Sequence, residues 1–361
     1  MKPSSPTSYT LKIAVCILVM AVPGAARAEV VDLTFAHPPD APSATERTLQ
    51  SLVTVRDIGE AYATGGLYLL THYGDREALF EAENRKLLET PFREQTWRYC
   101  SLFAARGGED VVFGRNWDNQ NVGSIIVSLY RPPGGHASIS ICRAIDLGFP
   151  LNAGLDDLAG SPYGERLLLA PFLSMDGINE HGLAVAVAGV RDEPVAPREG
   201  RDLVFISYLI RRILDRAATV EEAVDLAEDC VPFLLDRGSV QGHLLVADAA
   251  GRSVALEYVD DRWRTITTVT PWQVLANRPV FDVPDASLRE RCWRTASMSD
   301  ALETTGGDVD WRTGLDILRG VEQKGTTWSA AYSLRERTLH LSVYQDWETV
   351  YRLEVPREDA P

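Results

Sequence analysis

The stretch Tyr99-Cys100-Ser101-Leu102-Phe103-Ala104-Ala105-Arg106 is followed closely by Gly114-Arg115-Asn116-Trp117-Asp118. Short apolar runs separated by glycine-containing turns are typical of neighbouring strands in a meander. A cysteine is a nucleophile only as the thiolate, so Cys100 would need a base or a positive neighbour. Arg115 and Asp118 lie downstream of Cys100 in this pattern and could be its charged partners, so Cys100 is a candidate nucleophile.

The sequence offers Cys100 no recognisable side-chain base. None of the six histidines lies in a Cys/His motif, and the papain-like, metalloprotease, phosphate-loop and serine-hydrolase motifs are absent. The α-amino group of Cys100 could serve, because an α-amine has a pKa of about 7.7 to 8.0, which suits proton transfer near neutral pH. That group exists only after the peptide bond between Tyr99 and Cys100 is cut. The sequence therefore predicts cleavage there.

The first 28 residues have the pattern of an export signal. Lys2 and Lys12 precede an apolar stretch over residues 13–22, and Ala26-Arg27-Ala28 has the small-x-small form of a signal-peptidase site. A transmembrane anchor would need about 20 apolar residues, roughly twice this length. We expect cleavage after Ala28 and a periplasmic or extracellular protein; an uncleaved N-terminal anchor is the alternative.

Charge and cysteine spacing exclude several classes of partner. Loss of the signal would remove three positive charges and no acid, which takes the net charge from -15 to -18. Such a surface repels nucleic acid and anionic lipid. Cys142, Cys230 and Cys292 lack the close spacing of zinc or redox motifs, so we expect no metal and no cofactor. They are expected to be core thiols, with at most one disulfide among them.

The pattern divides the chain at Cys100 and predicts an α+β fold. Residues 29–99 form an N-terminal portion that is mainly helical over 53–88, where Asp75 can cap a helix that ends before Pro91. After Cys100 the pattern predicts strands, two helices, strands, helices and strands, hence two antiparallel sheets with helices outside. The expected helices cover 206–213, 219–226, 288–302 and 311–321. The expected strands cover 101–105, 111–113, 124–129, 167–174, 183–190, 243–248, 253–258, 265–269, 273–276, 327–334, 338–344 and 349–355.

Five stretches in order resemble the cysteine N-terminal-nucleophile (Ntn) hydrolases, namely the linear amide hydrolases related to choloylglycine hydrolase and penicillin V acylase, and the acyltransferases related to isopenicillin N acyltransferase. The resemblance covers residues 100 to about 355 and implies an αββα sandwich, in which two packed sheets lie between outer helices. The five stretches are Cys100 with Gly114–Asp118, then Asp176–Leu183, His243–Asp248 with Gly251–Ser253, Val274–Pro279 and Thr327–Ala330.

The resemblance also implies site residues. Cys100 would be the nucleophile and, through its α-amine, the general base. Asp118 would hold that amine, Arg115 would orient the cluster, and Asn277 would donate to the oxyanion of the tetrahedral intermediate. Arg291 matches the family's late active-site arginine, with Arg294 as the alternative. Asn179 and His181 are expected to be turn residues.

Two departures distinguish this chain from the choloylglycine and penicillin enzymes, and the second favours the acyltransferase group. The position near Gly189 lacks the Asn or Tyr of the choloylglycine and penicillin enzymes, so a second oxyanion donor would be a backbone N–H. Residues 29–99 also separate the signal from Cys100, which resembles precursors that cut themselves into a small α chain and a large β chain, here 29–99 and 100–361. The resemblance implies an α/β heterodimer acting on a small-molecule amide. A choloylglycine or penicillin V type of hydrolase, or an inactive exported binding protein, remains the alternative.

Overall fold

The computed structural model describes residues 28–35, 41–56, 66–89, 99–119, 123–151, 154–155, 163–190, 200–233 and 241–357. The expected export signal, apart from Ala28, lies outside these residues, and so does Pro91. Within the described ranges, no helix has both the length and the apolar character needed to cross a membrane.

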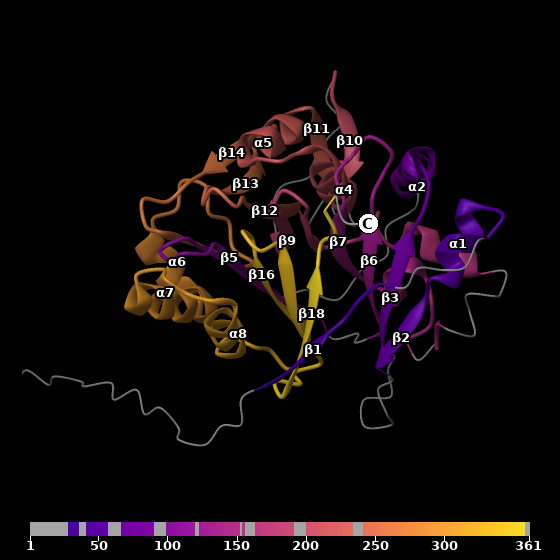
Figure 1. The fold of residues 1–361 in the computed structure, drawn as a ribbon. Coiled ribbons are helices and arrows are strands. Elements are labelled where there is room, and N and C mark those ends of the chain that lie inside the picture. Colours follow the sequence, from indigo (N-terminus) through magenta and orange to yellow (C-terminus); the bar gives the residue numbers. More distant parts are fainter. Residues whose placement is uncertain are drawn as a thin grey trace, which may run out of the picture.

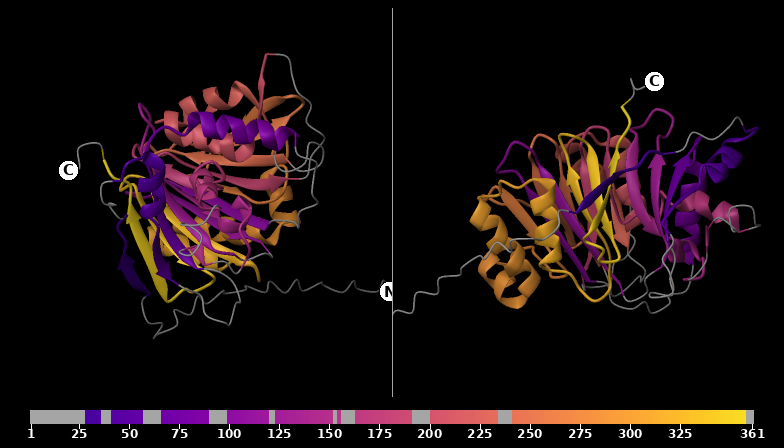
Figure 2. Two further views of the ribbon diagram at one scale, coloured as in Figure 1. Left: turned by 90° about the vertical axis from the view of Figure 1, so that its right-hand side faces the viewer. Right: turned by 60° about the horizontal axis from the view of Figure 1, so that its bottom comes forward.

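Two large sheets face each other (Figures 1 and 2). The seven-stranded sheet has the order β1 (Glu29–Asp32), β18 (Thr349–Glu354), β17 (Thr338–Val343), β16 (Thr326–Ser333), β5 (Val112–Asp118), β4 (Tyr99–Ala105) and β15 (Trp272–Leu275). The nine-stranded sheet has the order β14 (Arg262–Ile266), β13 (Ser253–Val259), β12 (Gln241–Ala247), β9 (Ala184–Val190), β8 (Asp176–Asn179), β7 (Ser138–Arg143), β6 (Ile125–Tyr130), β3 (Leu67–His72) and β2 (Val53–Arg56). Their inner faces form one core of buried apolar side chains.

Helices cover the outer face of each sheet. Helices α4 (Ile206–Arg216) and α5 (Val220–Glu228) pack on β8, β9, β12 and β13, whereas α7 (Trp293–Thr305) and α8 (Trp311–Arg319) pack on β4, β5, β15 and β16. Figure 1 shows these two helical layers on opposite sides of the molecule. The predicted αββα sandwich is confirmed. The remaining elements are α1 (Ala44–Gln50), α2 (Glu77–Glu89), α6 (Asp285–Arg291), the 3-10 helices η1 (Ala144–Leu147) and η2 (Gly164–Leu169), and the small parallel pair β10 (Asp202–Phe205) and β11 (Cys230–Phe233).

The two helix N-caps expected from the sequence, at Asp75 and Thr219, are present. The carboxylate of Asp75 accepts a hydrogen bond of 2.9 Å from the backbone N–H of Glu77, at the start of α2. Thr219 accepts from the N–H of Glu222 at the start of α5. Each bond satisfies a backbone donor that the first turn of a helix leaves free.

The expectation of a mainly helical segment over 53–88 was wrong at β2 and β3. Leu67–His72 is a strand, β3, in which every residue is buried. It pairs in parallel with β6 and antiparallel with β2. A short continuous apolar run has no helical or strand periodicity, so only its neighbours in the sheet decide its conformation.

Three other expectations need correction. Residues 167–174, expected as a strand, lie in η2 and the turns after it. Strand β15 does not extend the sheet of β12–β14 but pairs with β4 in the other sheet. The helix expected over 288–302 is two helices, because Cys292 has an extended backbone between α6 and α7.

The N-terminal portion is built into both sheets. Strand β1 pairs in parallel with β18 at one edge of the seven-stranded sheet, and β2 and β3 form one edge of the nine-stranded sheet. A cut before Cys100 would therefore leave the preceding residues held by two sets of backbone hydrogen bonds. Cys142, Cys230 and Cys292 are buried free thiols.

Candidate active site

Cys100 is the second residue of β4, beside the end of β5. It is fully buried and lies opposite Trp117 in the antiparallel ladder, while Tyr99 lies opposite Asp118. Tyr99, by contrast, is 48% exposed. The peptide bond predicted to be cut therefore joins an exposed residue to a buried one, directly across the sheet from Asp118.

Arg115 and Asp118 lie on opposite faces of the seven-stranded sheet. Successive side chains of a strand point to opposite faces, so Cys100 shares a face with Arg115 and Trp117. This face points into the core toward the nine-stranded sheet, where Arg115 reaches the carbonyl of Val187 in β9. Asn116 points the other way and donates to the carbonyl of Leu318 in α8. Arg115 therefore approaches Cys100 from within the core.

Arg115 places a buried guanidinium beside the cysteine sulfur. Its Nη2 lies 3.9 Å from Sγ of Cys100, and its Nη1 donates to the carbonyls of Met175 and Val187 at 3.3 and 3.1 Å. Its Nε lies 3.3 Å from Oδ1 of Asp176, and both side chains are fully buried. A cation held next to sulfur stabilises the thiolate form.

Aromatic rings complete the surroundings of this guanidinium. The rings of Trp117 and Trp328 stack with centroids 5.2 Å apart, and the Arg115 guanidinium lies 4.6 and 5.6 Å from those centroids. Asp176 accepts a hydrogen bond of 2.6 Å from the hydroxyl of Tyr332. Burial raises the pKa of Asp176, whereas the nearby Arg115 charge and the Tyr332 hydrogen bond lower it. Arg115 is thus fixed by groups from both sheets.

Asn277 contacts the backbone of Cys100 from the loop after β15. Its Oδ1 accepts from the N–H of Cys100 at 2.6 Å and from Nη2 of Arg294 at 3.0 Å, and its Nδ2 donates to the carbonyl of Gly189 at 2.8 Å. In the uncut chain, Asn277 therefore holds the amide nitrogen that cleavage would convert to the α-amine. Gly189, the position that departs from the family pattern, contributes its carbonyl to the same contact.

Two buried side chains of the nine-stranded sheet fix this loop. Nε2 of His243 lies 2.6 Å from the carbonyl of Ala276, and burial lowers the pKa of His243 to about 4, so the ring is neutral and donates. Oε2 of Glu257 accepts from the N–H groups of Val280 and Phe281 at 2.9 and 2.7 Å. The loop that carries Asn277 is therefore anchored on both sides of that residue.

The arginine beside Cys100 is Arg294 rather than Arg291. Arg294 is 6% exposed; its Nη1 donates to the carbonyl of Cys100 and to Oγ of Ser101, the latter at 3.1 Å. Arg291 is the last residue of α6 and is exposed. The chain turns at Cys292, so the first turn of α7, and not the end of α6, faces the site. The geometry therefore places Arg294, the alternative offered by the sequence, beside Cys100, and Arg291 away from it.

Asp118 lies next to the predicted cleavage site without contacting the Cys100 nitrogen. Its Oδ1 accepts from Oγ1 of Thr326 at 2.6 Å, and its Oδ2 is buried with no hydrogen-bond partner among the described residues. Burial raises the pKa of Asp118 to about 7, against the opposing effects of the Thr326 hydrogen bond and the Arg294 charge. Oδ2 is thus available to an α-amine formed at Cys100.

This shift predicts a pH-dependent stability in the uncut chain. The folded state binds the Asp118 proton up to about pH 7, whereas an unfolded aspartate releases it near its ordinary pKa of about 3.9. The folded state therefore holds the Asp118 proton through this interval, so the contribution of Asp118 to the free energy of unfolding falls as pH rises from about 4 to about 7. In a Cys100→Ala background, Asp118→Asn should show a smaller fall in urea unfolding between pH 5 and 7.5. Asp300→Asn, which alters an exposed acid, should keep the parent's slope; equal slopes for all three would contradict the assignment.

Two comparisons bear on this arrangement. Residues 170–277 match the family model of acyl-coenzyme A:6-aminopenicillanic acid acyl-transferase. A mutant of conjugated bile acid hydrolase from Clostridium perfringens is similar in structure, with a TM-score of 0.52 and 14% identity over 71% of this chain and 92% of that chain. Penicillin V acylase from Agrobacterium tumefaciens also has a TM-score of 0.52, with 16% identity over 71% of this chain and 86% of that chain.

This chain has the αββα fold of the Ntn hydrolases. The family match over 170–277 supports the choloylglycine hydrolase-like Ntn group within that fold. No curated protein matches the sequence significantly. The sequence reasoning placed Cys100, Arg115, Asp118 and Asn277 in one region, and the structure brings them together.

Sequence reasoning missed two residues that contact the candidate site. Asp176 lies within a motif that carried the resemblance. It pairs with Arg115 only because the two sheets pack face to face, which the sequence does not show. Thr326 had no signal beyond its position before Trp328, yet it binds Asp118. Asn179 was expected to lie in a turn but is the last residue of β8, where its Oδ1 accepts from the N–H groups of His181 and Leu183 in the turn that follows.

Proposed function

We propose that this Ntn hydrolase is an exported, self-processing amidase or acyltransferase that cleaves a linear amide bond of a small molecule. The observation that carries the proposal is the convergence of Arg115, Asn277 and Arg294 on Cys100, whose sulfur and backbone are each contacted. A buried thiol with no chemical role would not need two buried arginines. The signal-like first 28 residues support export.

Self-cleavage would begin at the Tyr99 carbonyl. Sγ of Cys100 attacks that carbon, the peptide nitrogen leaves with the thiol proton, and a thioester forms. Water then hydrolyses the thioester, which leaves a carboxylate on Tyr99 and an α-amine on Cys100. Asn277, bonded to the Cys100 nitrogen, and Arg294, bonded to the Cys100 carbonyl, hold the backbone on the C-terminal side of this bond.

Substrate turnover would reuse the same sulfur. The α-amine of Cys100 takes the thiol proton, the thiolate attacks the substrate carbonyl, and the leaving amine departs with that proton. Water or an acceptor amine then releases the acyl group from sulfur. Nδ2 of Asn277 carries a second hydrogen besides the one donated to Gly189, which is the group proposed to reach the oxyanion.

Intact-mass spectrometry combined with an amide panel tests the proposal. The purified wild type should contain a fragment that begins at Cys100, and it should release amines from a panel of amides with varied acyl chains. Uncut wild-type protein under active conditions would refute self-processing. Cut protein that hydrolyses no amide, passes no acyl group to an amine and resists rapid alkylation at Cys100 would instead favour a binding protein.

Replacement of Arg294 and of Arg291 tests which of the two arginines acts at the site. Arg294→Ala removes the contacts to Cys100, Ser101 and Asn277, and the resulting misplacement should lower kcat/KM on the order of 100-fold. Arg291→Ala removes a positive charge of the same type from an exposed position and should change kcat/KM by less than about twofold. A reversed order of the two effects would restore Arg291 to the site.

A further inference from the structure

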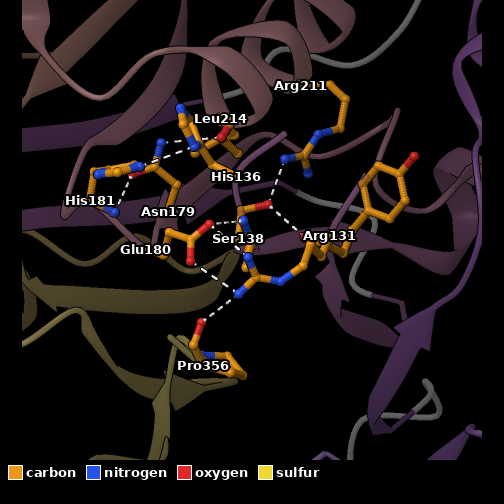
Figure 3. A network of polar contacts seen from close by, with 11 residues as sticks. Arg131, His136, Ser138, Asn179, Glu180, His181, Arg211, Leu214 and Pro356 are labelled. Carbon is orange, nitrogen blue, oxygen red and sulfur yellow. Dashed lines mark hydrogen bonds and ion pairs between the residues drawn. The ribbon is translucent and has the colours of Figure 1, made fainter. Parts of the chain in front are cut away.

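A pair of histidines meets at one end of the central strands β6–β9 of the nine-stranded sheet, away from Cys100. His136 lies in the loop between β6 and β7, and His181 lies in the turn between β8 and β9 (Figure 3). Nδ1 of His136 is 3.0 Å from Nε2 of His181, and the two rings are nearly perpendicular, at 77°. Two segments far apart in sequence thus direct ring nitrogens at one point.

One ring nitrogen of His136 can offer a lone pair to a metal ion. Nδ1 of His136 faces the ring of His181, so Nε2 of His136 lies on the far side of the ring and can carry its proton. A neutral imidazole that donates from one nitrogen presents a lone pair on the other, and metal-bound histidines are commonly held in this way.

His181 is also positioned by its turn. Its backbone N–H donates to Oδ1 of Asn179 at 3.1 Å, and Gly182 after it has a φ of +76°, which an L side chain rarely adopts. The same turn carries Glu180. The three candidate ligand atoms of His136, Glu180 and His181 lie within 4.8 Å of one another.

Glu180 is held in place by Arg131 and the backbone. Its Oε1 accepts from Nη1 of Arg131 at 3.0 Å and from the N–H of Ala137 at 2.8 Å, and its Oε2 accepts from Nη2 of Arg131 at 3.0 Å (Figure 3). A carboxylate oxygen has two lone pairs, so Oε2 keeps one that these bonds do not use. The carboxylate is therefore oriented, and its charge is partly balanced by Arg131.

We propose that His136, His181 and Glu180 bind one divalent first-row transition-metal ion of the Zn²⁺ type, with water completing the coordination. Two nitrogens bound to one tetrahedral zinc at about 2.0 to 2.1 Å lie about 3.3 Å apart, close to the separation found here. Two imidazoles and one carboxylate are a ligand set that suits zinc. The histidines are the principal ligands, because Glu180 must share its charge with Arg131. The ion would join the β6–β7 loop to the β8–β9 turn.

Calorimetry with zinc alone tests the site. In the full Cys100→Ala chain, which lacks the candidate nucleophile thiol, one equivalent of Zn²⁺ should bind. His181→Ala changes an exposed side chain and should weaken binding by more than about tenfold, whereas Glu180→Gln should weaken it less. Glu165→Gln removes an exposed acid outside the cluster and should leave the affinity unchanged. Binding that is absent, or equally strong in His181→Ala, would overturn the proposal.

Electron paramagnetic resonance with Cu²⁺ identifies the ligands independently of activity. One equivalent of Cu²⁺ in the same chain should show coupling to two imidazole nitrogens, and His136→Ala and His181→Ala should each leave one. A spectrum that keeps its nitrogen pattern in both variants would place the metal elsewhere and refute the site. Circular dichroism of each variant confirms that the fold is intact.

Discussion

Cys100→Ala should yield a single uncut chain with no amide hydrolysis or acyl transfer. The substitution removes the sulfur that would attack both the Tyr99 carbonyl and the substrate, and its small volume should leave the packing around Trp117 and Arg115 intact. Loss of a covalent nucleophile can cost on the order of 10⁶-fold in kcat where base and oxyanion contacts depend on it. Intact-mass spectrometry and an amide assay measure the two losses separately.

The matched control for this prediction is Cys230→Ala. Cys230 is also a fully buried free thiol, but its sulfur donates to the carbonyl of Ala227 in the α5–β11 region and takes no part in the site. We expect that variant to be cut at Cys100 and to remain active. If Cys100→Ala were still cut before residue 100, cleavage would come from another protease. If it still hydrolysed amides, Cys100 would not be the nucleophile.

Asp176→Asn should lower the free energy of unfolding by about 3–5 kcal/mol, because it leaves the buried Arg115 guanidinium without its counter-charge. The two residues lie on β5 and β8, so this ion pair joins the two sheets directly beneath Cys100. Urea unfolding of the variants in the uncut Cys100→Ala chain measures the change. The double variant Arg115→Met with Asp176→Leu should recover part of the loss, since it leaves no unpaired buried charge.

An exposed Asp–Arg pair in the same fold provides the comparison. Asp32 of β1 and Arg352 of β18 lie 3.0 Å apart with side chains 69% and 40% exposed. Asp32→Asn should cost less than about 1 kcal/mol, because water screens and solvates both charges. Similar losses for Asp32→Asn and Asp176→Asn would show that the Arg115–Asp176 pair does not carry the expected energy.

The sequence was most predictive where structure is local. The cap of Asp75 and the amphipathic helix after Phe205 depend on residues within a few positions of each other, and both were found as expected. The strand pair on either side of Gly251 was also recovered, because its turn lies in the sequence itself. Segments decided by distant neighbours were the ones mistaken: β3 was taken as helix, and β15 was placed in the wrong sheet.

The site shows the same division. The family resemblance pointed to Cys100, Arg115, Asp118 and Asn277, but it did not say from which face of the sheet each would approach. Arg115 and Asp118 are an odd number of positions apart, so the alternation of a strand sends them to opposite faces. The extended backbone at Cys292 likewise determines that Arg294, and not Arg291, lies beside Cys100. The hydrophobic periodicity of the sequence does not mark this break between α6 and α7.

By itself, the sequence indicated an α+β chain with a cysteine followed by an Arg and an Asp, and it predicted a removable segment before that cysteine. Those conclusions depend on residue types and short spacings, which can be read directly from the sequence. Only the tertiary structure decided that Asp176 holds Arg115, that Asn277 holds the Cys100 nitrogen and that Arg294 closes the site. Each of these contacts joins residues far apart in sequence, and it exists only because two sheets and a helical layer pack together at Cys100.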